Sequence, residues 1–144
     1  MSFSFKPEDQ YEQGGILLSL RPTSSSGTAT TPPPKWIKAG IEFYNSVPRI
    51  GTVATENYSD WSLNPVSGTG EWTTLIIERG EDVMGYSLWV YQLNGIEKIP
   101  LREITWAYGI GEDWEVKVEA YAAKPGDEGK PLTVNFKDFN VNWE

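Results

Sequence analysis

The 144-residue sequence contains no cysteine and no histidine. Without cysteine the chain cannot form disulfides, thiolate zinc sites or a cysteine nucleophile, and without histidine it cannot form a Ser-His-Asp triad. Only oxygen ligands could hold a metal, which favours Ca²⁺ or Mg²⁺ over zinc or copper. We therefore expect no cofactor and no metal site, and no catalytic residue stands out.

Basic residues are also scarce, with 12 Lys and Arg against 20 Asp and Glu and a net charge of −8. Such a surface repels phosphate groups, so neither a nucleic-acid nor a membrane partner is expected. No stretch approaches the roughly 20 apolar residues of a membrane span. The first residues lack the basic and apolar regions of a secretory signal, so we expect a cytoplasmic protein.

Helical apolar stripes are missing as well, and alternation with a period of two recurs along the chain. The runs with this pattern are 3–5, 14–20, 36–43, 50–55, 73–79, 83–93, 99–106, 114–123 and 132–141. Many short strands without helices predict an all-β fold, an antiparallel β-sandwich or barrel. Between two of these runs, Asn94-Gly95 predicts a hairpin with a type I′ turn.

The strand predicted at 36–43 has two different faces. Ile37, Ala39, Ile41 and Phe43 would form an apolar face, because side chains alternate along a strand. The other face would carry an aromatic, a cation, a gap and an anion, in the order Trp36, Lys38, Gly40, Glu42. This pattern predicts one face on the core and one face for contact, with Gly40 leaving space between the charges.

A second polar motif is Ser59-Asp60-Trp61-Ser62. A carboxylate accepts hydrogen bonds from sugar hydroxyls, while an indole covers the apolar face of a sugar ring. Arg102 adds a bidentate donor for a carboxylate. Trp36 and Trp61 are the candidate platform residues, and we expect most of the other tryptophans in the core: Trp72, Trp89, Trp106, Trp114 and Trp143.

Three other interpretations remain open. Lys38 and Glu42 could pair with Asp60 and Arg102 in a purely structural network on one sheet face. A glycoside hydrolase could use Glu42 and Asp60 as its carboxylate pair, if the two lie close enough. A protein-interaction module could use an exposed strand or the Ser/Thr/Pro-rich segment 22–34 as its contact.

Five segments together carry a family resemblance that spans nearly the whole chain. They are Tyr11-Glu12-Gln13-Gly14-Gly15-Ile16, Trp36-Ile37-Lys38-Ala39-Gly40-Ile41-Glu42, Thr55 before Ser59-Asp60-Trp61-Ser62, Leu101-Arg102-Glu103, and Phe136-Lys137-Asp138-Phe139. In this order the chain resembles an uncharacterised family of concanavalin A-like lectin/glucanase proteins that includes the fungal regulation-of-enolase proteins.

The resemblance implies a jelly-roll sandwich and a cytoplasmic, non-catalytic protein linked to enolase regulation. It places the family's polar motif positions on Gln13, Lys38, Glu42, Asp60, Trp61 and Arg102. Family members normally carry further N-terminal strands before the Gln13 motif, so we expect 1–144 to be a single domain that lacks them. Together with Trp36, these residues form the predicted ligand-binding set, with a saccharide or a protein as partner.

Overall fold

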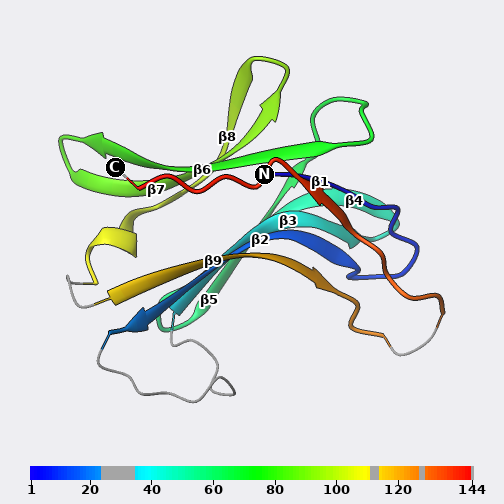
Figure 1. The fold of residues 1–144 in the computed structure, drawn as a ribbon, viewed down its shortest axis with the longest axis horizontal. Helices are drawn as coiled ribbons and strands as arrows, with labels where there is room; N and C mark the ends of the chain where they lie inside the picture. Colours follow the sequence, from blue (N-terminus) through cyan, green and yellow to red (C-terminus); the bar gives the residue numbers. More distant parts are fainter. Residues whose placement is uncertain (24–34, 111–113, 127–128, 144) are drawn as a thin grey trace.

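The computed structural model describes residues 1–23, 35–110, 114–126 and 129–143, which form two antiparallel five-stranded sheets packed face to face (Figure 1). The strand orders are β10-β1-β6-β7-β8 and β5-β4-β3-β2-β9. The prediction of an all-β antiparallel sandwich is therefore confirmed. The elements are β1 (Ser2–Ser4), β2 (Gln13–Pro22), β3 (Lys35–Tyr44), β4 (Val47–Thr55), β5 (Ser59–Pro65), β6 (Thr73–Asp82), β7 (Gly85–Asn94), β8 (Glu97–Ile104), the 3-10 helix η1 (Thr105–Tyr108), β9 (Trp114–Ala123) and β10 (Asn135–Lys137).

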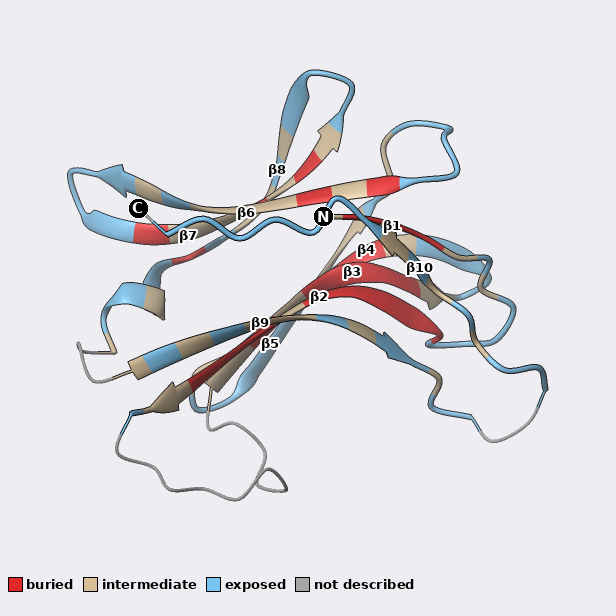
Figure 2. Ribbon diagram, in the orientation of Figure 1, coloured by how far each residue is buried: buried red, intermediate tan, exposed pale blue. Residues whose placement is uncertain are grey.

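The core lies between the two sheets and is built from one side of each strand. On β3, Ile37 and Ala39 are buried in it, as the alternation predicts. The opposite sheet contributes Phe3, Leu75 and Val90. Figure 2 shows burial concentrated in the middle strands of the β5–β9 sheet, because these strands have a neighbour on both sides.

Close approach of two strands explains why Gly15 and Gly40 are glycines. The two residues lie directly opposite each other on β2 and β3. A Cβ on Gly40 would lie 2.8 Å from Cα of Gly15, and one on Gly15 would lie 2.5 Å from Cα of Gly40. The space that the sequence pattern assigned to a ligand at Gly40 is thus needed first by the neighbouring backbone.

The type of one tight turn differs from the sequence expectation. Asn94 pairs with Glu97, and of the two turn residues between them only Gly95 has a positive φ, at 63°. That is the pattern of a type II′ turn, so the type I′ prediction is wrong. The type I′ pattern instead occurs in the β3–β4 hairpin, where Asn45 and Ser46 have φ of 50° and 63°.

Some strand and core predictions also needed correction. The Asp-Trp motif lies inside β5, a strand that the alternation did not predict, and the 132–141 run contains only the three-residue β10. Trp72 and Trp143 are exposed, and Trp89 is half-buried on the side of β7 opposite the core residue Val90, whereas Trp106 and Trp114 pack against the core as expected. An aromatic residue next to a strand thus becomes core only if the opposite sheet covers it.

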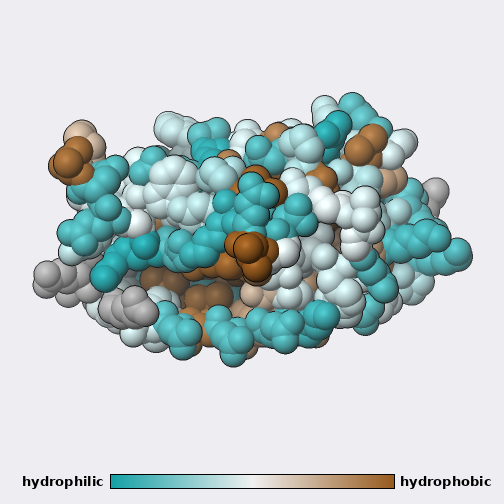
Figure 3. All heavy atoms as spheres, turned by 90° about the horizontal axis from the view of Figure 1, so that it is seen from above, coloured by the Kyte–Doolittle hydropathy of each residue, from teal (hydrophilic) through white to brown (hydrophobic). Residues whose placement is uncertain are grey.

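The three most exposed large apolar residues lie at hairpin turns. Val83, Met84 and Ile96 are the most exposed of the large apolar side chains. Seen from above, hydrophilic residues cover most of the surface and hydrophobic ones emerge in separate groups (Figure 3). In the described part of the chain, no helix has the length and apolar character that crossing a bilayer requires.

Candidate functional site

The seven predicted site residues fall on two different surfaces. The outer face, as we call it, is the side of the β5–β4–β3–β2–β9 sheet that points away from the other sheet. Alternation and register place on it Gln13, Trp36, Lys38, Glu42 and Trp61. Asp60 and Arg102 instead meet on the opposite side, where Arg102 of β8 reaches across from the other sheet. Figure 1 shows β9 bowed toward the other sheet at its middle, so the outer face is concave along that strand.

Glu42 is the most unusual residue of the outer face. It is only 7% exposed, yet within the described part of the chain its carboxylate forms no hydrogen bond or ion pair. Its Oε2 lies 2.9 Å from the position that a Cβ on Gly51 would occupy, and Nε1 of Trp61 lies 3.5 Å from the same point. The carboxylate and the indole N–H therefore converge over Gly51. The fully buried side-chain atoms without a partner in the described residues are Nε of Arg21 and Oγ1 of Thr52, so the Glu42 oxygens keep some access to solvent.

Lys38 lies on the same face, four residues before Glu42. Its Nζ donates a short hydrogen bond to Oε1 of Gln13 and lies 5.9 Å from the ring centroid of Tyr121. Burial lowers the pKa of Lys38, and the negative charge of Glu42 opposes that shift. Burial raises the pKa of Tyr121, and Glu42 raises it further. These four polar groups thus share one weakly hydrated environment on β2, β3 and β9.

An aromatic row borders this cluster. Tyr44 stands edge-on to Trp61, with ring centroids 5.6 Å apart, and Tyr11 lies 6.1 Å from Tyr44 on the other side. Tyr11 has a φ of 65°, a conformation that side-chain-bearing residues seldom adopt, and its amide donates to the Phe43 carbonyl. Trp61 and Tyr11 keep 45% and 41% of their surfaces exposed. The row therefore offers ring surface beside a buried carboxylate.

Trp36 is on the correct face but at the other end of the strand. Six residues separate it from Glu42 on β3, which is roughly 20 Å at about 3.3 Å per residue. It lies two residues from Lys38 on the same side. Trp36 and Glu42 therefore cannot contact the same small ligand.

Asp60 and Arg102 form a separate polar pair at the edge of the sandwich. Arg102 donates a short hydrogen bond to Oδ2 of Asp60 and a second of 3.2 Å to Oγ of Ser62. The Asp60 side chain is 74% exposed, while that of Arg102 is largely covered. The pair lines a cavity of about 420 Å³ together with Tyr58 and Trp106. The structural network predicted from the sequence joined Lys38 and Glu42 to Asp60 and Arg102. Among these four described residues, the ion pair that forms is the one between Asp60 and Arg102.

The two carboxylates of the hydrolase hypothesis are not neighbours. Glu42 is on β3 and Asp60 on β5, with β4 between them. Glu42 belongs to the outer face, whereas Asp60 faces the other sheet. The sheet itself therefore separates the two side chains, and they do not flank a common space. Paired-carboxylate hydrolysis requires both groups on either side of one glycosidic bond.

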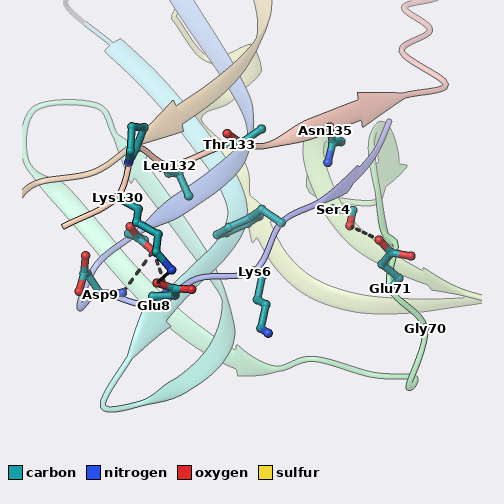
Figure 4. Close-up of a pocket in the computed structure, with 13 residues that line it drawn as sticks. Ser4, Lys6, Glu8, Asp9, Gly70, Glu71, Lys130, Leu132, Thr133 and Asn135 are labelled. Carbon is teal, nitrogen blue, oxygen red and sulfur yellow. Dashed lines mark hydrogen bonds and ion pairs between the residues drawn. The ribbon is translucent and has the colours of Figure 1, made fainter.

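A larger cavity than the one at Arg102 lies beside the segment that joins β1 to β2. It has a volume of about 630 Å³ and is shown in Figure 4, where Lys6, Glu8 and Asp9 follow one another along the segment and Ser4 faces Glu71. The buried carboxylate of Glu12 also lines it. In the described ranges, no three acidic side chains converge in a way that could hold a metal ion.

Sequence reasoning missed three residues of the outer face around Glu42: Tyr11, Tyr44 and Tyr121. Tyr44 could have been found, because it continues the alternation of Lys38 and Glu42 by one more step along the strand. Tyr121 could not, since its place opposite Gly15 depends on the pairing of β9 with β2. Most of the segment 22–34, predicted as a contact loop, lies outside the described residues.

Comparison with known proteins gives a family but no activity. Residues 1–143 match the family described as "Protein of unknown function (DUF1349)". An uncharacterised protein of Emericella nidulans is 37% identical over 136 residues, a match that covers 94% of this chain and 63% of that protein. The crystal structure of a functionally unknown protein from Saccharomyces cerevisiae superposes with a TM-score of 0.59 at 20% identity, covering 93% of this chain and 65% of that one.

These matches define how far the comparison extends. The chain spans a little under two thirds of the length of both proteins. At 20% identity the yeast structure supports the fold alone, whereas the family match covers nearly every residue described above. The chain therefore belongs to the DUF1349 family of proteins of unknown function.

Proposed function

We propose that this protein is a non-catalytic binding protein that takes a saccharide or sugar-like ligand on the outer face of the β5–β9 sheet. The observation that carries the proposal is Glu42, a residue only 7% exposed whose carboxylate has no hydrogen-bond partner in the described structure. Its oxygens are not among the fully buried atoms without a partner, which in the described residues are Nε of Arg21 and Oγ1 of Thr52. Glu42 therefore offers accessible acceptors at a largely covered position, which favours a role in binding. Sugar hydroxyls would supply the missing donors.

The neighbours of Glu42 fit the same ligand class. The ring faces of Trp61 and Tyr44 can cover the apolar C–H surface of a sugar ring. Lys38 has donors left beyond its bond to Gln13, because an ammonium group carries three. Aromatic surface with a few fixed polar groups is the usual composition of small-molecule sites.

Binding is proposed rather than hydrolysis because the acids do not form a pair. Glu42 lies on the outer face, and Asp60 is held by Arg102 on the opposite side of the sheet. No second carboxylate of the described residues interacts with Lys38 or Tyr121 beside Glu42. A single carboxylate can orient a ligand but cannot serve as both acid and base partner.

A glycan array followed by titration of tryptophan fluorescence with the best saccharides tests the proposal. Glu42→Gln and Trp61→Ala should each weaken binding at least tenfold, about 1.4 kcal/mol or more. Asp60→Asn is the matched control, because it removes a carboxylate next to Trp61 in the chain but on the other face, and it should leave the affinity unchanged. Circular dichroism checks that every variant is folded.

Two results would contradict the proposal. One is a wild-type protein that binds no saccharide on the array. The other is a saccharide whose affinity falls in Asp60→Asn and stays constant in Glu42→Gln, which would move the site to the cavity at Arg102.

The narrower inferences from the family resemblance remain predictions. They are a link to enolase regulation, a cytoplasmic location and a single domain over 1–144. Co-precipitation with purified enolase, compared between the wild type and Glu42→Gln, would show whether a protein partner uses the same face. Loss of enolase binding in this variant would favour a protein ligand over a saccharide.

A further inference from the structure

The edge strand β9 differs from the three other edges of the sandwich. β10 has only three residues, β8 contains Pro100 and a break in its pairing register, and β5 carries the inward-facing Asp60 and ends at Pro65. Short strands, proline, bulges and inward charges all hinder the pairing of an edge with another chain. Of the features that protect an edge, β9 has only charged side chains: Trp114–Ala123 is ten residues long, without glycine or proline, and pairs with β2 residue by residue.

The charges of β9 alternate along its outer side, in the order Glu115, Lys117, Glu119. In a pair of copies related by a two-fold axis perpendicular to the sheet, the two β9 strands run antiparallel. The axis then passes between the two copies of one residue, which lie opposite each other, and we name each register by that residue. An axis at Val118 places Lys117 of each copy opposite Glu119 of the other. An axis at Lys117 or at Glu119 places like charges opposite each other, which is destabilising.

The register centred on Val118 also gives the longest pairing without like charges opposed. It pairs residues 114–122 of both copies, whereas an axis at Val116 would pair only 114–118 of the strand. On the inner side it sets Trp114 opposite Ala122 and Val116 opposite Ala120, so a large apolar residue meets a small one. Charge, length and apolar pairing therefore select the same register.

We propose that two copies of this chain associate through their β9 edges in this register, forming one continuous ten-stranded sheet. Within one chain, Nζ of Lys117 lies 2.6 Å from Oε1 of Glu119, but the lysine side chain is 65% exposed. Such an exposed ion pair is weak, so Lys117 can pair with Glu119 of the other copy instead. The backbone groups of both edges, which pair with no further strand of the described structure, become hydrogen-bonded. The two outer faces become one surface, so a polymeric ligand could contact both copies at once. The association itself does not depend on what the outer face binds.

A charge swap tests the proposal by sedimentation velocity over a concentration series. Lys117→Glu places Glu opposite Glu at both positions of the interface, and Glu119→Lys places Lys opposite Lys. Each variant alone should dissociate at least tenfold more readily than the wild type, from the loss of two attractive pairs and the gain of two repulsive ones. An equimolar mixture of the two variants restores opposite charges and should form the heterodimer.

The matched control is Lys130→Glu, which makes the same change of charge at an exposed lysine outside β9. It should associate as the wild type does. A wild type that stays monomeric up to about 1 mM, the weak end of specific association, would overturn the proposal. So would variants that dimerise alone, or a mixture that fails to form a heterodimer while both variants keep the wild-type circular dichroism spectrum.

Discussion

The contacts of Glu12 predict that its carboxylate is a main support of the loop leading into β2. The side chain is 4% exposed. Its Oε2 accepts hydrogen bonds from the amides of Glu8 and Asp9, at 2.7 and 3.2 Å, and its Oε1 accepts one of 2.7 Å from Nζ of Lys124. One carboxylate thus joins the β1–β2 segment to the residue after β9.

Replacement of Glu12 by Gln keeps the shape and removes the charge. An amide has one acceptor oxygen, so its NH₂ group would face either the backbone amides or the Lys124 ammonium, donor against donor. Hydrogen bonds to a charged group are worth about 1.5–3 kcal/mol, and leaving one partner of a buried pair unmatched is costly. We expect the free energy of unfolding to fall by about 2–4 kcal/mol in Glu12→Gln.

The same contacts predict how the effect depends on pH. Burial raises the pKa of Glu12, but hydrogen bonds from Lys124 and from the Glu8 and Asp9 amides more than offset it, so the net shift is below the ordinary 4.5. A depressed pKa in the folded state contributes stability above the unfolded value that is lost as pH falls through the folded value. The difference between wild type and Glu12→Gln should therefore be full at pH 7 and shrink below pH 4.5.

Urea unfolding followed by tryptophan fluorescence, repeated from neutral to acidic pH, measures this difference. Glu8→Gln is the matched control. The Glu8 side chain is exposed, and its one ion pair in the described structure, 3.6 Å long, is with the exposed Lys130, so the substitution should change the free energy of unfolding by less than about 0.5 kcal/mol. The reasoning would be refuted by a Glu12→Gln effect no larger than that of the control, or by an effect that does not shrink in acid.

Three further outcomes follow from the structure. Gly40→Ala should abolish or severely destabilise folding, because the added Cβ would lie 2.8 Å from a neighbouring backbone Cα, and a thermal melt by circular dichroism measures this. Asp60→Asn should change the free energy of unfolding by no more than about 1 kcal/mol, because the Asp60 carboxylate that pairs with Arg102 is exposed to solvent, where ion pairs contribute little. A larger loss in a urea titration would contradict this. Leu75→Ala, at a fully buried position, should cost about 2–5 kcal/mol in the same assay, and a smaller loss would mean that the core closes around the cavity.

Alternation predicted the strands well where one side of a strand is covered by the opposite sheet. It succeeded at 36–43, where Ile37 and Ala39 enter the core, and failed at 59–65, where the residues that face the other sheet, Asp60, Ser62 and Asn64, are all polar. A strand with polar residues on its inner side shows no apolar face toward the core. Trp72 and Trp143 lie at positions that no sheet of the described structure covers.

The sequence by itself determined the fold class and the two-sided character of β3, since alternation and the absence of helical stripes depend only on neighbouring residues. Only the tertiary structure decided which polar residues share a site. Strand pairing brought Tyr121 and Gln13 to Lys38 and Glu42, while the alternation of β5 directed Asp60 away from Trp61 and toward Arg102. Register across strands is set by packing and by contacts between distant segments, and a one-residue shift would reverse every one of these assignments.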